Sequence, residues 1–145
     1  MKKQVFIADS ISAAVLSLLL YTALSKLWDY KSFKAVLSVS PLLKSRAGLI
    51  AWLLPAIEIT VSLLLFFPST RKTGLQLAFG LITSFTIYLA GMILLTPNLP
   101  CNCGGVLASL TWPQHILFNL FFILLSLLGI ILYKKHNETM KQTPP

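Results

Sequence analysis

Residues 113–133 read PQHILFNLFFILLSLLGIILY, a run of 21 residues that contains no Asp, Glu, Lys or Arg. A helix of this length matches the thickness of the hydrocarbon core of a bilayer. Three earlier runs have the same character, at about residues 7–27, 48–67 and 74–95. We therefore expect an all-α, integral membrane four-helix bundle formed by residues 1–136. Residues 137–145 are expected to be a disordered polar tail.

The overall composition excludes an ordinary soluble domain. Hydrophobic residues make up 56% of the chain and charged residues 11%, whereas about a quarter of a soluble domain is charged. The net charge of +8 suggests nucleic acid at first sight. The basic residues, however, gather at the ends of the apolar runs, where they meet lipid headgroups. We therefore expect membrane lipid, and no nucleic acid, around this chain.

The first apolar run follows Lys2 and Lys3, as the core of a secretory signal also would. The run is about as long as a full membrane span, however, and three further spans follow it. We therefore expect it to be an uncleaved transmembrane helix rather than a signal.

The connection between the first and second runs is longer than a plain turn. In it Phe33, Val36 and Leu37 recur at helical spacing, with Lys31 and Lys34 elsewhere around the turn. This pattern favours a short interfacial helix lying on the membrane surface over a solvated basic loop.

The third run contains three glycines, Gly74, Gly80 and Gly91. Small residues let two membrane helices approach closely, because no side chain separates their backbones. We therefore expect the third helix to make close contacts at these positions.

Four spans place both termini on the same side of the membrane. Seven Lys or Arg residues fall on that side and five on the other, and an excess of positive charge marks the cytoplasmic side. The connection between the third and fourth runs has no Lys or Arg. We therefore expect cytoplasmic termini in a bacterial inner membrane, with this last connection facing the periplasm or exterior.

The last connection holds both cysteines of the chain, Cys101 and Cys103, one residue apart. Extended residues at this spacing lie at or beyond the Cα separation that a disulfide allows, so a bridge between them requires a bent backbone. Pro100 stiffens the entry to the pair, and Gly104 and Gly105 give backbone freedom after it. A strained bridge exchanges easily with other thiols, so we expect redox function here.

Two alternatives for the cysteine pair remain open. The first is a pair of inert thiols in an apolar loop. The second is a soft metal such as Cu(I), held by two thiolates. It ranks behind redox function because the chain has no third cysteine and no methionine cluster, and we predict no metal site.

Several polar side chains are expected inside the spans, where burying charge in lipid is costly. Glu58 falls about ten residues into the second run and needs a partner, a proton or water. Lys26, at the outer end of the first run, is long enough to snorkel toward the headgroups. His115 and Asn119 are four residues apart and so share one helix face near the cysteines. These four residues are expected to form a polar pocket for proton transfer or for a quinone headgroup. Purely structural roles for Glu58 and His115 are the alternative.

Three short motifs follow one another along the chain: Lys26-Leu27-x-Asp29, Pro55-x-x-Glu58, and Cys101-x-Cys103 followed by glycine. In order and placement they resemble the MauE/DoxX-like family of redox-associated membrane proteins, of the methylamine-utilisation MauE type. Members of that family tend to read Cys-Gly-Cys-Phe-Gly at the last motif, whereas this chain has Cys-Asn-Cys-Gly-Gly. The dithiol is therefore kept while the local turn differs.

The resemblance implies a helical bundle linked to disulfide formation or to the maturation of exported redox proteins. Relatives of the DoxX type are associated with quinone-linked electron transfer, so a quinone is the cofactor to consider. The leading hypothesis is a thiol-disulfide oxidoreductase whose partner is a thioredoxin-like or exported thiol protein. The rival is a non-catalytic membrane chaperone or assembly subunit that docks an exported protein. Partner, direction of electron flow, attacked cysteine and oligomeric state stay open.

Overall fold

The computed structural model describes residues 2–95 and 111–142, and the segment that contains both cysteines lies outside these ranges. Every regular element in the described ranges is helical. The elements in chain order are α1 (Lys2–Trp28), α2 (Tyr30–Val39), the 3₁₀ turn η1 (Lys44–Arg46), α3 (Ala47–Phe66), α4 (Arg71–Leu95) and α5 (Trp112–Gln142). This confirms the all-α prediction.

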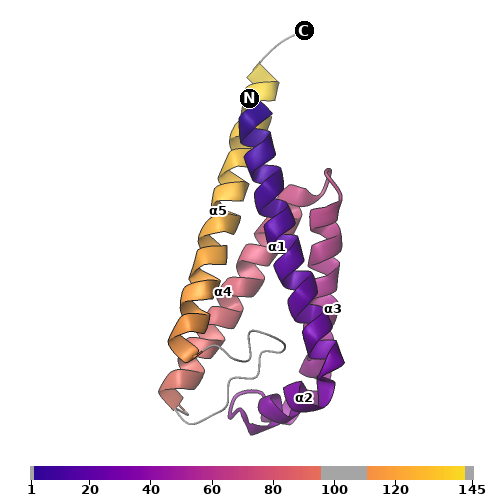
Figure 1. Cartoon of the computed structure of the whole chain (residues 1–145), viewed down its shortest axis with the longest axis vertical. Coiled ribbons are helices and arrows are strands. Elements are labelled where there is room, and N and C mark those ends of the chain that lie inside the picture. The colour runs from indigo at the N-terminus through magenta and orange to yellow at the C-terminus, as the bar shows by residue number, and fades with distance from the viewer. Residues whose placement is uncertain (1, 96–110, 143–145) are drawn as a thin grey trace.

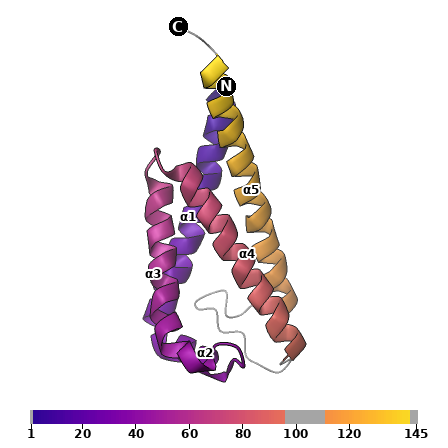
Figure 2. The ribbon, with the colours of Figure 1, turned by 180° about the vertical axis from the view of Figure 1, so that it is seen from behind.

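The four long helices form an antiparallel bundle (Figure 1). Each packs against two others, in the order α1, α3, α4, α5 and back to α1. Both termini lie at one end of the bundle, together with the turn between α3 and α4 (Figure 1). The view from behind shows α2 at the opposite end, where α4 ends and α5 begins (Figure 2). We call this second end the α2 end. The predicted four-helix bundle is thus confirmed.

The outer surface of the bundle is apolar. Each of the four long helices contains a stretch long and apolar enough to cross a membrane. Large hydrophobic side chains point outward from them, among them Leu94, Leu117 and Ile87, which are 85%, 70% and 68% exposed. A soluble monomer does not expose apolar surface on this scale, whereas lipid chains cover it without cost. The chain is therefore an integral membrane protein.

The helix boundaries differ from the expected ones at both termini. Helix α1 begins at Lys2, five residues before the apolar run that predicted it. Helix α5 continues to Gln142, so the tail expected to be disordered from Asn137 is helical as far as that residue. Polar residues extend both helices because intrahelical hydrogen bonds do not require an apolar side chain.

The centre of the bundle is a cluster of buried aliphatic residues. From α1 it takes residues spaced by four along one face, which meet partners from α3 and α4: Ile11, Val15, Leu19, Val61, Leu65, Leu75, Ala78 and Ile82. Gly129 lets α5 approach this cluster, because a Cβ atom there would lie 2.9 Å from Leu75 Cδ1. Small residues therefore set the helix spacing, as is usual where lipid rather than water surrounds a bundle.

Only one of the three glycines predicted to allow close contacts in α4 does so. A Cβ atom on Gly74 would lie 3.0 Å from the backbone nitrogen of Leu65, whereas Gly80 and Gly91 have no neighbour within 4 Å of that position among the described residues. The prediction was wrong for Gly80 and Gly91. Sequence alone does not show which face of a uniformly apolar helix meets another helix.

Because Gly74 and Gly80 have different surroundings, the same glycine-to-alanine substitution is expected to change stability differently at the two positions. Gly74→Ala should destabilise the bundle by about 1–3 kcal/mol, because the new methyl group meets a backbone atom that cannot move aside. Gly80→Ala should be neutral or stabilising by up to about 1 kcal/mol, because alanine favours the helix and meets open space. Thermal unfolding of both variants in the same detergent measures the difference. Equal midpoints would contradict the packing described for α4.

The predicted interfacial helix is present as α2, which lies across the α2 end of the bundle (Figure 1). Asp29 caps it by accepting a hydrogen bond from the backbone nitrogen of Ser32 at 3.4 Å. Phe33 and Leu37 are buried against the start of α3, while Lys31 is exposed. The helix thus presents one apolar face to the bundle and a basic face outward, as an interfacial helix does.

The opposite end, near the termini, is tied together by a polar cluster that the sequence did not reveal. Arg71 Nη1 at the start of α4 lies 2.7 Å from Asp9 Oδ1 on α1. The hydroxyl of Tyr133 on α5 donates a hydrogen bond to the same carboxylate oxygen. Three helices therefore meet at Asp9.

Candidate functional site

The predicted catalytic pair and its flanking residues lie outside the described residues. These are Pro100, Cys101, Cys103, Gly104 and Gly105. The ends that hold the segment are described: α4 ends at Leu95 and α5 begins at Trp112, both at the α2 end (Figure 1).

Chain length restricts where the cysteines can be. Cys101 is six residues beyond Leu95, a reach of at most about 22 Å for extended chain. Helix α4 is about 37 Å long at 1.5 Å per residue. The covalent connection therefore limits the distance between Cys101 and the end of α4 at Leu95 to this reach.

A buried ion pair lies at the same end of the bundle. Lys26 Nζ on α1 is 2.6 Å from Glu58 Oε1 on α3, and the two side chains are only 3% and 8% exposed. The ammonium also donates a hydrogen bond of 3.5 Å to the carbonyl oxygen of Thr22, one helical turn earlier. The sequence predicted Lys26 and Glu58 in one polar pocket and left open whether Glu58 has a partner, a proton or water. The structure turns Lys26 inward, onto Glu58.

Aromatic rings surround the ammonium of Lys26. Its Nζ lies 5.9 Å from the ring centre of Phe33 on α2 and 6.0 Å from that of Phe85 on α4. A cation is attracted to ring faces at this range, more strongly when water is excluded. Four helices therefore converge on one lysine, which sits only two residues from the end of α1.

The other two predicted pocket residues come from α5. His115 is 1% exposed and Asn119 is 6% exposed, and their spacing of four places them on one helix face. Phe85 also packs near His115, with ring centres 6.3 Å apart. The start of α5 is capped by a hydrogen bond in which the Thr111 backbone nitrogen donates to Gln114 Oε1 at 2.9 Å, one of the two bonds of a capping box. The cap fixes His115 at the point where the cysteine segment ends.

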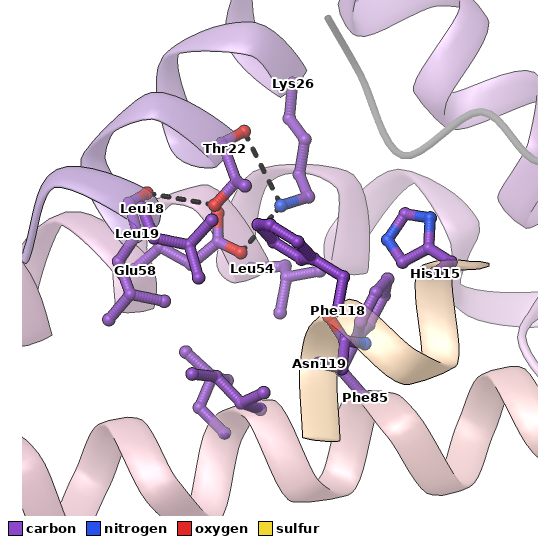
Figure 3. A pocket seen from close by; sticks show the side chains of 12 residues that line it. Leu18, Leu19, Thr22, Lys26, Leu54, Glu58, Phe85, His115, Phe118 and Asn119 are labelled. Atoms are coloured by element: carbon purple, nitrogen blue, oxygen red, sulfur yellow. Dashed lines mark hydrogen bonds and ion pairs between the residues drawn. The ribbon is translucent and has the colours of Figure 1, made fainter. Parts of the chain in front are cut away.

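All four predicted pocket residues line one cavity of about 40 Å³. Figure 3 shows Lys26 from α1, Glu58 from α3 and Asn119 from α5 around this space. The structure thus brings together residues up to 93 positions apart in the sequence, from Lys26 to Asn119. A cavity that holds an aromatic ring measures about 150 Å³, whereas a water needs only about 10–15 Å³. The cavity therefore has room for water but not for a quinone ring.

Sequence reasoning missed several residues of this site. Thr22 could have been found, because it precedes Lys26 by four residues and so shares its helix face. Phe85 and Phe118 also line the cavity, but nothing distinguishes them in sequence from phenylalanines that face lipid. In the described part of the chain, no three His, Cys, Asp or Glu side chains are grouped as metal ligands.

The family model described as methylamine utilisation protein MauE matches residues 4–132 of the chain. The chain belongs to the MauE family. The match covers the second and third spans completely and nearly all of the first and fourth, and it includes the Lys26–Glu58 pair and the cysteine segment. Comparison with curated proteins and with solved structures finds no match.

The arrangement in this MauE-family chain suits proton handling. Glu58 is an acid–base group with one oxygen held by Lys26, and His115 and Asn119 supply further hydrogen-bonding atoms around the cavity. All of them lie at the end of the bundle to which the dithiol is tethered.

Proposed function

We propose that this MauE-family protein is a membrane thiol-disulfide oxidoreductase that uses Cys101 and Cys103 to exchange disulfides with a thioredoxin-like or exported thiol protein. A thiolate of the partner attacks the Cys101–Cys103 bridge and forms a mixed disulfide. A second partner thiol then displaces the chain, which leaves with both cysteines reduced. The partner thereby gains a disulfide, and two electrons have moved to the chain.

The observation that carries this proposal is the buried Lys26–Glu58 pair at the α2 end of the bundle. A charged pair buried in lipid is costly and is retained mainly where it serves a function. The only dithiol in the sequence is tethered to the same end by the adjoining ends of α4 and α5. Membership of the MauE family over residues 4–132 gives further support.

Reoxidation of the dithiol requires an acceptor of two electrons and two protons. A lipid quinone has this stoichiometry and is the acceptor that we propose. The cavity beside Glu58 is too small for its ring, so we assign Glu58 to protons and not to quinone binding.

We further propose that the α2 end faces the periplasm or exterior of a bacterial inner membrane. The segment between α4 and α5 contains no Lys or Arg, whereas both termini and the turn between α3 and α4 carry several. A disulfide also persists only in an oxidising compartment.

One labelling experiment tests the side of the membrane and the disulfide together. Intact cells are treated with a membrane-impermeant maleimide carrying a mass tag, before and after an impermeant phosphine reductant. We expect no adduct before reduction, two adducts per chain after it, and one in Cys101→Ser after reduction. Labelling only after the membrane is permeabilised would contradict the orientation. Equal labelling with and without reductant would contradict the resting disulfide.

A further inference from the structure

Unpaired polar atoms identify an unassigned part of this site. Among the described residues, buried side-chain atoms that lack a hydrogen-bond partner occur in four residues: Glu58 Oε2, Thr83 Oγ1, Asn119 Nδ2 and Ser126 Oγ. Leaving such an atom buried and unpaired costs its lost hydration without a compensating hydrogen bond. Two of these atoms, Glu58 Oε2 and Asn119 Nδ2, belong to residues that line the same cavity, and this coincidence points to an occupant.

The two atoms are chemically complementary. Glu58 Oε1 is engaged by Lys26 at 2.6 Å, so Oε2 is the carboxylate oxygen available to accept a hydrogen bond. Asn119 Nδ2 is a donor. One small molecule that donates to the carboxylate and accepts from the amide would satisfy both.

The size of the cavity selects the occupant. Its volume of about 40 Å³ accommodates about one or two water molecules. A cation finds only one carboxylate, already paired with Lys26, and an anion would meet the Glu58 oxygen at close range. Water has the required size and can donate and accept at once.

We infer that this cavity binds ordered water, which donates a hydrogen bond to Glu58 Oε2 and accepts one from Asn119 Nδ2. This water and the Glu58 carboxyl group together form a site that can hold a proton temporarily, which we call the proton station. A thiol that attacks a disulfide gives up a proton, and the cysteine that leaves takes one up. The station holds that proton between the two steps: Oε2 accepts it through the water while Oε1 stays on Lys26. Only the transfer of the thiol proton rests on the proposed function. The bound water is inferred from the two unpaired atoms and does not depend on the chemistry of the cysteines.

Two matched substitutions test the site, because we expect them to shift the unfolding midpoint in different directions. Asn119→Leu removes the amide and fills part of the cavity, so it displaces the water and leaves Glu58 Oε2 without a partner. We expect its unfolding midpoint in detergent to fall by several degrees. Ser126→Ala is the control, because Ser126 Oγ is also buried and unpaired but does not line the cavity. Its midpoint should stay unchanged or rise. A rise in Asn119→Leu as well would show that the cavity is dry and would overturn the inference.

A direct measurement keeps the inference testable if Asn119→Leu does not fold. The full-length protein, labelled with ¹⁵N at asparagine, is examined by NMR for magnetisation transfer between water and side-chain amides, and the Asn119 signal is assigned by its loss in Asn119→Asp. A long-lived water contact at Asn119 is the expected result. Its absence would overturn the site. A water contact without disulfide exchange would overturn the proposed function alone.

Discussion

Replacing Lys26 with methionine is expected to destabilise the protein by about 3–5 kcal/mol. Methionine keeps the length of the side chain but removes the charge, so the Glu58 carboxylate is left buried without its partner. The ion pair is 2.6 Å long and nearly inaccessible, and losing one member of such a pair costs more than the pair itself contributes. Since a domain is stable by only about 5–15 kcal/mol in total, the variant should accumulate poorly in membranes.

The control for Lys26→Met is Lys31→Met. Lys31 lies on the exposed face of α2, and such a surface substitution should change stability by less than about 0.5 kcal/mol. Unfolding midpoints in detergent and steady-state amounts in membranes give the comparison. Similar values for the two variants would contradict a stabilising pairing of Lys26 with Glu58.

A double variant separates stability from function at this pair. Lys26→Met combined with Glu58→Leu replaces both charges by apolar groups, a change that is often neutral or stabilising. We expect it to recover the lost stability while disulfide exchange remains slow, because no carboxyl group is left to take a proton. Full exchange activity in the recovered protein would reduce Glu58 to a structural role.

The fold was predictable because its main determinant is local. Each span is a continuous apolar run, and the interfacial helix α2 follows from the spacing of Phe33 and Leu37. Side-chain pairing was not predictable in the same way. The sequence places Glu58 within a span but does not show which helix faces it, so Lys26 as its partner emerges only from the packing of α1 against α3.

Two other features of the packing could not be predicted from the sequence either. Asp9, Arg71 and Tyr133 meet at the end near the termini, although nothing in their sequence neighbourhoods links them. Gly80 and Gly74 share one apolar helix, yet only Gly74 lies against a neighbouring backbone. In a membrane helix the outward face is as apolar as the inward face, so hydrophobic periodicity cannot indicate which is which.

Single serine substitutions of the two cysteines are expected to have unequal effects. When the partner is supplied in its disulfide form, the thiolate of the one remaining cysteine can attack that disulfide, and the mixed disulfide persists because no second thiol of the chain can displace the partner. The variant that keeps the cysteine bonded to the partner should therefore accumulate a covalent adduct, whereas the other should be inactive without one. The double variant should lose exchange entirely, down to the level of membranes that lack the chain.

A docking subunit predicts a different pattern for the same three variants. Its function depends on the surface of the loop and not on the thiols, so serine, which is close to cysteine in size, would preserve it. The chain has no other cysteine, and no other thiol could substitute in the double variant. The double variant is therefore the decisive one.

The most direct measurement is disulfide exchange by membranes that contain Cys101→Ser/Cys103→Ser. Membranes with equal amounts of wild-type, single and double variants are incubated with a thioredoxin-like protein, added reduced in one series and in its disulfide form in another, then quenched with acid, alkylated and resolved on a non-reducing gel. We predict oxidation of the reduced protein by wild type, a reducible adduct with the disulfide form in one single variant, and neither in the double variant. Wild-type exchange rates in the double variant would contradict the proposed redox function.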